Sequence, residues 1–105
     1  MKEHSDSIIQ HNRCCYVCGE TGGLHRHHIY GGARRDASEE DGCWIYLCGS
    51  HHNLSNEGIH FNKKLDTKVK IQAEKIWINT YVPELTREEQ IDAFIKRFGR
   101  NYLDE

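Results

Sequence analysis

Cysteine and histidine are concentrated in one stretch of this 105-residue chain, and that stretch constrains the fold more than any other feature. All five cysteines, and six of the eight histidines, lie between Cys14 and His60. An odd number of cysteines argues against a closed set of disulfides, and cysteine mixed with histidine favours metal binding. We therefore expect a reducing, cytoplasmic environment. The polar N-terminus and the lack of a long apolar stretch predict neither a signal peptide nor a membrane partner.

Two ligand pairs have the spacing of a zinc knuckle. Cys15-x-x-Cys18 is followed about thirty residues later by Cys48-x-x-His51. Zinc prefers four nitrogen or sulfur ligands in a tetrahedron, and a two-residue gap lets each pair supply two of them. We predict a structural Zn²⁺ on these four residues. Two alternatives stay open, namely isolated buried thiols and a register shifted by one residue in which Cys14 is a ligand.

Core-forming residues are scarce, which increases the structural importance of a metal site. Leu, Ile, Val and Phe together account for 22 of the 105 residues, close to the level at which chains remain disordered. The length allows a single domain, residues 1–105. Within it we expect a zinc knuckle and a Cys/His-rich body over residues 13–62 and C-terminal helices over residues 63–105.

Short patterned runs predict a small α+β fold. Residues 43–48 are predicted as a strand, because they are a short run rich in aromatic and β-branched residues. Residues 24–30 are predicted as a further short strand, which Gly31 and Gly32 end. Residues 33–42 are polar and charged and are predicted as a loop. Ser50 is predicted to cap a short helix that continues to about Asn56.

Two longer helices are predicted in the C-terminal part. Asn62 caps the first, and Thr86 with Glu89 forms a capping box that opens the second, which Gly99 ends. Apolar residues recur at helical spacing on both. These stripes are Leu65, Val69, Ala73 and Ile76 on the first helix and Ile91, Phe94, Ile95 and Phe98 on the second.

Two pairs of adjacent histidines indicate a second site. Neighbours on a strand point to opposite faces, so His27 and His28 cannot both bind one ion without a distortion. His51 and His52 are about 100° apart on a helix, so one can face the zinc knuckle and the other a second site. We therefore expect a division of labour within each pair.

The sequence around these histidines, HRHHIYGG…IYLCGSHHN, resembles the HNH, or ββα-metal, nuclease motif. That motif is a β-hairpin followed by a helix, which clasp one divalent cation, often beside a zinc knuckle. The longer string HHIYGGARRDASEEDG…LCGSHHNLSNEGIHFNKKLD resembles the phage-encoded recombination-enhancement nucleases that act with a RecA filament. The resemblance covers roughly residues 13–78. It implies a zinc-stabilised ββα-metal (His-Me finger) fold and a DNA endonuclease, with a RecA-type filament as a further partner.

The resemblance also implies roles for individual residues. His28 matches the general base of the motif. His60 matches a position that the recombination-enhancement nucleases retain, which makes it a candidate active-site residue. The middle asparagine of the motif, which pins the loop, is replaced here by Cys43. The residues that match the ligands of the catalytic cation are His27, His52 and Asn56.

The implied chemistry is hydrolysis of a phosphodiester bond. A histidine can take the proton of the attacking water, and one cation can clamp the phosphate. We expect Mg²⁺ or Mn²⁺ as the catalytic cation, although imidazole ligands also admit other transition metals. The residues expected to meet DNA phosphates are Arg26, Arg34 and Arg35 near the hairpin and Lys63, Lys64, Lys68 and Lys70 on the first long helix.

The net charge of −2 excludes a protein that holds nucleic acid by overall charge alone. Contact with DNA must therefore use a local basic patch, a partner or dimerisation. Two alternatives to a nuclease are a catalytically silent zinc-knuckle module that binds nucleic acid or protein, and a small zinc-stabilised scaffold. The nuclease is favoured because a purely structural zinc site has no use for His27, His28, His52 and Asn56.

Overall fold

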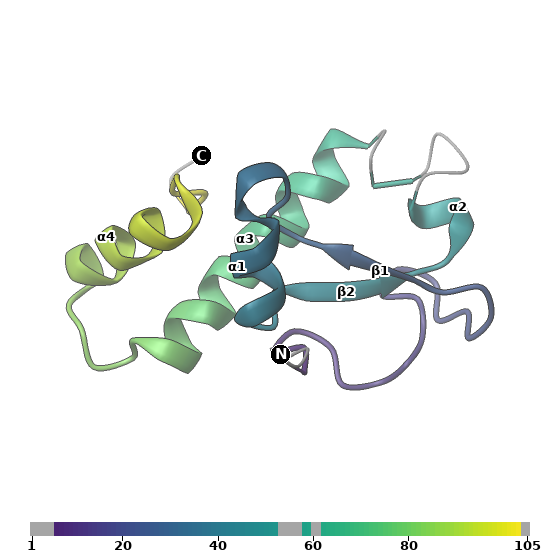
Figure 1. The fold of residues 1–105 in the computed structure, drawn as a ribbon, viewed down its shortest axis with the longest axis horizontal. Helices are drawn as coiled ribbons and strands as arrows, with labels where there is room; N and C mark the ends of the chain where they lie inside the picture. The colour runs from purple at the N-terminus through teal and green to yellow at the C-terminus, as the bar shows by residue number, and fades with distance from the viewer. Residues whose placement is uncertain (1–5, 53–57, 60–61, 104–105) are drawn as a thin grey trace.

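The computed structural model describes residues 6–52, 58–59 and 62–103 of the protein. It is a small α+β fold with a two-stranded sheet (Figure 1). In that view α1 and α2 lie at opposite ends of the sheet, and α3 runs obliquely to the strands. No helix among the described residues has both the length and the apolar character needed to cross a membrane. The elements are β1 (His25–His28), the 3-10 helix η1 (Gly32–Arg34), α1 (Arg35–Glu40), β2 (Trp44–Leu47), α2 (Gly49–His52), α3 (Lys63–Tyr81) and α4 (Arg87–Phe98).

The two strands pair antiparallel within the segments predicted as strands. His25 lies opposite Leu47, and His28 lies opposite Trp44. Successive side chains of a strand point to opposite faces, so His27 and His28 are separated by the sheet as the sequence predicts. One face carries His25, His27, Ile45 and Leu47, and the other carries Arg26, His28, Trp44 and Tyr46.

The prediction of a loop over residues 33–42 is wrong, because this segment completes η1 and forms α1. A fully buried side chain, Ser38, fixes the short helix between the two strands. Its hydroxyl accepts a hydrogen bond from the backbone N–H of Tyr30 at 3.2 Å and donates to the carbonyl of Cys43. A helix of six residues is too short to be stable by itself, so these tertiary contacts decide its conformation.

The predicted helix boundaries are confirmed at α3 and α4. Asn62 accepts a hydrogen bond from the backbone N–H of Leu65 at the start of α3. Both hydrogen bonds of the capping box between Thr86 and Glu89 are present, and Gly99 ends α4 in the left-handed conformation.

The predicted cap of the short helix is wrong. The helix begins at Gly49, and the carbonyl of Cys48 accepts the backbone N–H groups of His51 and His52. Ser50 therefore lies inside the first turn of α2. The segment between His52 and Gly58, where the predicted helix would continue to Asn56, lies outside the described residues.

The core is an aromatic cluster between the sheet and the two long helices. Tyr30 is 2% exposed, and its ring lies 4.5 Å from that of Phe98 and 5.3 Å from that of Phe94. Burial raises the pKa of Tyr30, whose hydroxyl donates to the carbonyl of Lys70 at 2.8 Å. Trp77 is also buried and belongs to this core. The further buried residues are Ile29, Ile45, Leu47, Ile59, Val69 and Ala73.

An ion-paired carboxylate connects the end of α1 to both long helices. Asp41 accepts the indole N–H of Trp77 at 2.9 Å. It also accepts Nε and Nη2 of Arg97, at 2.8 and 2.9 Å. These contacts attach α1 to α3 and α4, and thereby fix the segment that precedes β2.

The turn between α1 and β2 requires glycine. Gly42 has φ +76°, and a Cβ there would collide with the carbonyl of Asp6 and lie 3.1 Å from the backbone nitrogen of Ile8. We expect Gly42→Ala to lower the free energy of unfolding by at least about 1 kcal/mol, because it adds a strained dihedral to a backbone clash. Urea denaturation measures this change.

Gly31→Ala is the matched control for that substitution. Gly31 has φ −94°, and a Cβ there would meet nothing within 4 Å. Its stability should change by no more than about 0.5 kcal/mol. Equal stability of the two variants would contradict the assigned role of Gly42.

Candidate functional site

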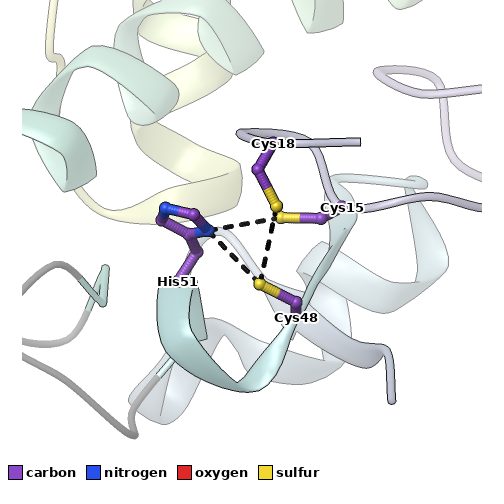
Figure 2. Close-up of side chains that lie close together, drawn as sticks. All are labelled: Cys15, Cys18, Cys48 and His51. Carbon is purple, nitrogen blue, oxygen red and sulfur yellow. Dashed lines mark hydrogen bonds between the residues drawn. The ribbon is translucent and has the colours of Figure 1, made fainter. Parts of the chain in front are cut away.

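The structure brings together the four residues that the sequence predicts as zinc ligands (Figure 2). One ligand atom from each of Cys15, Cys18, Cys48 and His51 lies within 4.8 Å of every other. The sulfur atoms of Cys18 and Cys48 are 3.7 Å apart, and Nδ1 of His51 is 3.2 Å from the sulfur of Cys48 and 3.8 Å from that of Cys15. In a zinc tetrahedron these edges are about 3.8 Å between sulfurs and about 3.6 Å between sulfur and nitrogen. The cluster could hold a metal ion, and its geometry is compatible with zinc.

Backbone hydrogen bonds place the two halves of the cluster against each other. Gly19 donates to the carbonyl of Cys15 at 2.9 Å, which closes the turn of the first half. Tyr16 donates to the carbonyl of Tyr46 at 2.8 Å and so attaches this turn to β2. The second half lies where β2 leads into α2. The cluster therefore joins the N-terminal segment to the sheet and to the first turn of α2.

The electrostatics of Cys15 favour its metal-binding form. Burial raises the pKa of its thiol, but the backbone N–H groups of Cys48, Cys18 and Val17 lower the pKa more, to about 6. A thiolate, not a thiol, is the ligand of a metal ion. The thiol of Cys43 differs, because burial raises its pKa and favours the protonated form. Cys14 is half-buried and outside the cluster, so the register with Cys15 as ligand is the one the structure contains.

A second group of histidines lies on the other side of α2. His51 points to the cysteines, whereas His52 contacts the face of β1 that carries His25 and His27. Nδ1 of His52 is 2.9 Å from Nδ1 of His25, and its ring centroid is 5.4 Å from that of the buried His27. His27 and His52 are thus neighbours, as the division of labour predicts. Among the described residues, however, three or more metal-ligating atoms come this close together only in the Cys/His cluster.

His28 occupies the opposite face of the sheet, with a carboxylate beside it. Its Nε2 is 2.6 Å from Oε1 of Glu39, and its Nδ1 accepts Nε–H of Arg35 at 3.3 Å. Oε2 of the same carboxylate is 2.6 Å from Nη1 of Arg26, and this guanidinium lies 3.8 Å from the centre of the Trp44 ring. The ring of His28 is consequently held between an acidic and a basic side chain.

Two clefts meet at His28. The larger, about 480 Å³, is lined by Arg26, His28, Arg35, Asp36 and Glu39. The smaller, about 250 Å³, lies where β1 ends and faces α3. Since His27 and His28 both line the smaller cleft, a ligand there would reach side chains from both faces of the sheet. The other residues of the smaller cleft are Ile29, Gly31, Ile59, Asp66 and Lys70.

The basic residues predicted to contact DNA lie on several elements, namely β1, η1, α1 and α3. Arg34 donates to the carbonyl of Arg97 at 3.4 Å, near the end of α4. Lys70 pairs with Asp66 at 2.9 Å and lines the smaller cleft. Their roles toward DNA stay predictions, as do those of the exposed Lys63, Lys64 and Lys68 at the start of α3.

Two predicted site residues, Asn56 and His60, lie outside the described residues. Two others were missed by sequence reasoning, namely Glu39, which contacts His28, and Ser38, which bridges the strand ends. Both lie in the segment that was predicted as a loop. The hydroxyl of Ser38 connects the end of β1 to the start of β2, through Tyr30 and Cys43. No local signal in the sequence distinguishes Ser38 or Glu39 from neighbouring polar residues.

Three arrangements of side chains determine which chemistry the site can perform. These are a four-ligand Cys/His cluster, a histidine group between β1 and α2, and a histidine held by a carboxylate at the junction of two clefts. Any assignment of function depends on this geometry. Comparisons with protein-family models, with curated proteins and with solved structures found no match to this chain.

Proposed function

We propose that this protein is a metal-dependent DNA endonuclease of the HNH, or ββα-metal, type, with a structural zinc on the Cys/His cluster. The observation that carries the proposal is the placement of His28, which lines both clefts and lies next to His27 on the strand. A structural metal site alone requires neither His28 in a cleft nor His52 against β1. In the proposed hydrolysis of a phosphodiester, His28 and His52 each have a role.

The proposed roles follow from the two faces of the sheet. His28 accepts a proton from the attacking water through Nδ1, the ring nitrogen that contacts Arg35, a residue that also lines the larger cleft. His27 and His52 lie on the opposite face of the sheet and are the proposed ligands of the cation that binds the phosphate. Asn56 is a further expected ligand. Arg35 is exposed and lies at Nδ1, where a phosphate would meet its guanidinium.

The imidazoles of His27 and His52 would favour a divalent cation with affinity for nitrogen at the proposed second site. Imidazoles suit nickel or zinc, whereas Mn²⁺ and Mg²⁺ prefer oxygen ligands and Mg²⁺ keeps several waters. When bound, a divalent cation supplies positive charge to the phosphate and to the leaving oxygen. His27 is buried, so the chain excludes bulk water on one side of this position.

DNA is the proposed substrate, and a RecA-type filament is a proposed partner. The start of α3 carries exposed lysines, and the smaller cleft opens between α3 and the end of β1. A strand of nucleic acid lying along α3 would reach His27 and His28 from there. Because the whole chain has a net charge of −2, a partner that concentrates DNA would add to this local attraction.

A nicking assay tests the proposal. Supercoiled plasmid and single-stranded circles are incubated with the zinc-loaded protein, with Mg²⁺, Mn²⁺, Ni²⁺ or excess chelator, and with or without a recombinase filament. We expect metal-dependent conversion to nicked or linear products, and none in the presence of chelator. If no DNA is cleaved with any of these ions or with the filament, the nuclease proposal fails and a binding module takes its place.

A further inference from the structure

The carboxylate of Glu39 is fixed on both sides. Its Oε1 is 2.6 Å from Nε2 of His28, and its Oε2 accepts Nη1 of Arg26 at 2.6 Å. Arg26 in turn packs over the ring of Trp44, 3.8 Å from its centre, and Trp44 is 5% exposed. With each oxygen engaged and its backbone in α1, the carboxylate has little rotational freedom, because charge-assisted hydrogen bonds are short and directional.

These contacts determine which nitrogen of His28 carries the proton. A guanidinium can only donate hydrogen bonds, so Nδ1 of His28 accepts from Arg35. A carboxylate that lacks a proton can only accept, so Nε2–H donates to Glu39. The arrangement that satisfies both contacts has the ring proton on Nε2 and the lone pair on Nδ1, at the edge of the larger cleft.

We propose that Glu39 is a positioning residue for His28, holding the ring proton on Nε2 so that Nδ1 can take a proton from the attacking water once the guanidinium of Arg35 turns from Nδ1 to the phosphate. This inference rests on the proposed nuclease function. As the water oxygen bonds to phosphorus, its O–H bond breaks and the proton passes to Nδ1. The bond from phosphorus to the 3′ oxygen breaks, and that oxygen keeps the electron pair and takes a proton from solvent. Glu39 then lies beside the imidazolium and stabilises its charge.

The hydrogen bond itself is tested by NMR, independently of activity. An imidazole N–H exchanges with water too quickly to be observed unless a strong hydrogen bond holds it. We expect a downfield ring N–H signal in the zinc-loaded parent, which His28→Ala removes and thereby assigns. Glu39→Ala should remove the same signal. Glu40→Gln is the matched control, since Glu40 is the next residue of α1 and pairs with Arg97 at 3.3 Å, and it should leave the signal in place.

The effect on the reaction is tested by cleavage kinetics on the same variants. Glu39→Ala should lower kcat by about 10- to 100-fold, as is usual for residues that orient a reacting group, with little change in KM. Glu39→Gln keeps the size and one acceptor, so its kcat should lie between those of the parent and Glu39→Ala. In a His28→Ala background, Glu39→Ala should cause no further loss, because it acts only through that ring.

The outcomes separate this inference from the proposed function. Two outcomes would show that Glu39 is not a positioning residue while the nuclease proposal stands. In the first, the parent cleaves DNA and Glu39→Ala cleaves it equally well. In the second, Glu39→Ala lowers kcat in the His28→Ala background by as much as it does in the parent. A parent without the ring N–H signal, or one in which Glu39→Ala retains it, also overturns the inference. Circular dichroism on each variant verifies the fold, and Glu39→Gln keeps the test decisive if Glu39→Ala does not fold. A parent that never cleaves overturns the function and the inference together.

Discussion

Cys48→Ser should remove the bound metal and unfold most of the protein. Cys48 supplies one of four ligand atoms and lies where β2 leads into α2, so its loss releases the N-terminal segment from the sheet. Metal binding in zinc-dependent folds contributes about 10–16 kcal/mol, which is comparable to the whole stability of a small domain. Each lost kcal/mol lowers Tm by about 4–8 °C in a chain of this size. We therefore expect a Tm lower by more than about 15 °C, or no cooperative transition, measured by circular dichroism.

Cys14→Ser is the matched control for this experiment. Cys14 precedes Cys15 in the sequence but is not part of the cluster. The variant should bind one equivalent of zinc and melt like the parent, as measured by metal analysis and thermal unfolding. A Cys48→Ser protein that keeps its zinc and its Tm would refute the metal assignment. Loss of zinc in Cys14→Ser instead would show that the register is shifted by one residue.

In the proposed nuclease, His28→Ala should abolish most cleavage while leaving the fold and both of the proposed metal sites in place. The imidazole contacts Glu39 and Arg35 and is not part of the Cys/His cluster. Removal of a positioned proton acceptor usually lowers the rate by about 10²- to 10⁴-fold. DNA binding, measured by fluorescence anisotropy, should stay close to that of the parent. Equal cleavage by the variant and the parent would refute the role of His28 as general base.

His52→Ala provides the contrasting result. His52 lies against His25 and His27, so its loss should weaken binding of the proposed catalytic cation as well as lower the rate. Raising the concentration of Mn²⁺ should therefore restore part of the activity of His52→Ala and none of that of His28→Ala. If both variants respond to metal in the same way, the separation of roles between the two faces of the sheet is incorrect.

The sequence predicts those features whose signals are local. The spacing of Cys15, Cys18, Cys48 and His51 predicts a shared ligand set because each pair is confined to one turn. Strand alternation likewise separates His27 from His28 without knowledge of the partner strand. The caps of α3 and α4 are local hydrogen bonds and were predicted correctly.

The features that the sequence does not predict depend on contacts between distant segments. Helix α1 has six residues, and its conformation depends on Ser38 between the strands and on Asp41 against Trp77. Glu39 reaches His28 only because α1 forms. The prediction of a loop at this position therefore gave no indication of this contact. The aromatic stack of Arg26 on Trp44 is also invisible in the sequence, where Arg26 reads only as a cation available to DNA.

Adjacent residues of α2 face two different sites, and this links the behaviour of those sites. His51 belongs to the Cys/His cluster, and the next residue, His52, contacts His25 and His27. The two side chains share one helical turn, whose N–H groups are anchored on the carbonyl of Cys48. A chelator that removes the metal, or an oxidant that modifies the cysteines, would therefore also shift the position of His52, although neither reacts with His52 itself. If the proposed nuclease function and zinc site are correct, an oxidising environment would abolish DNA cleavage at the same step at which it releases the zinc.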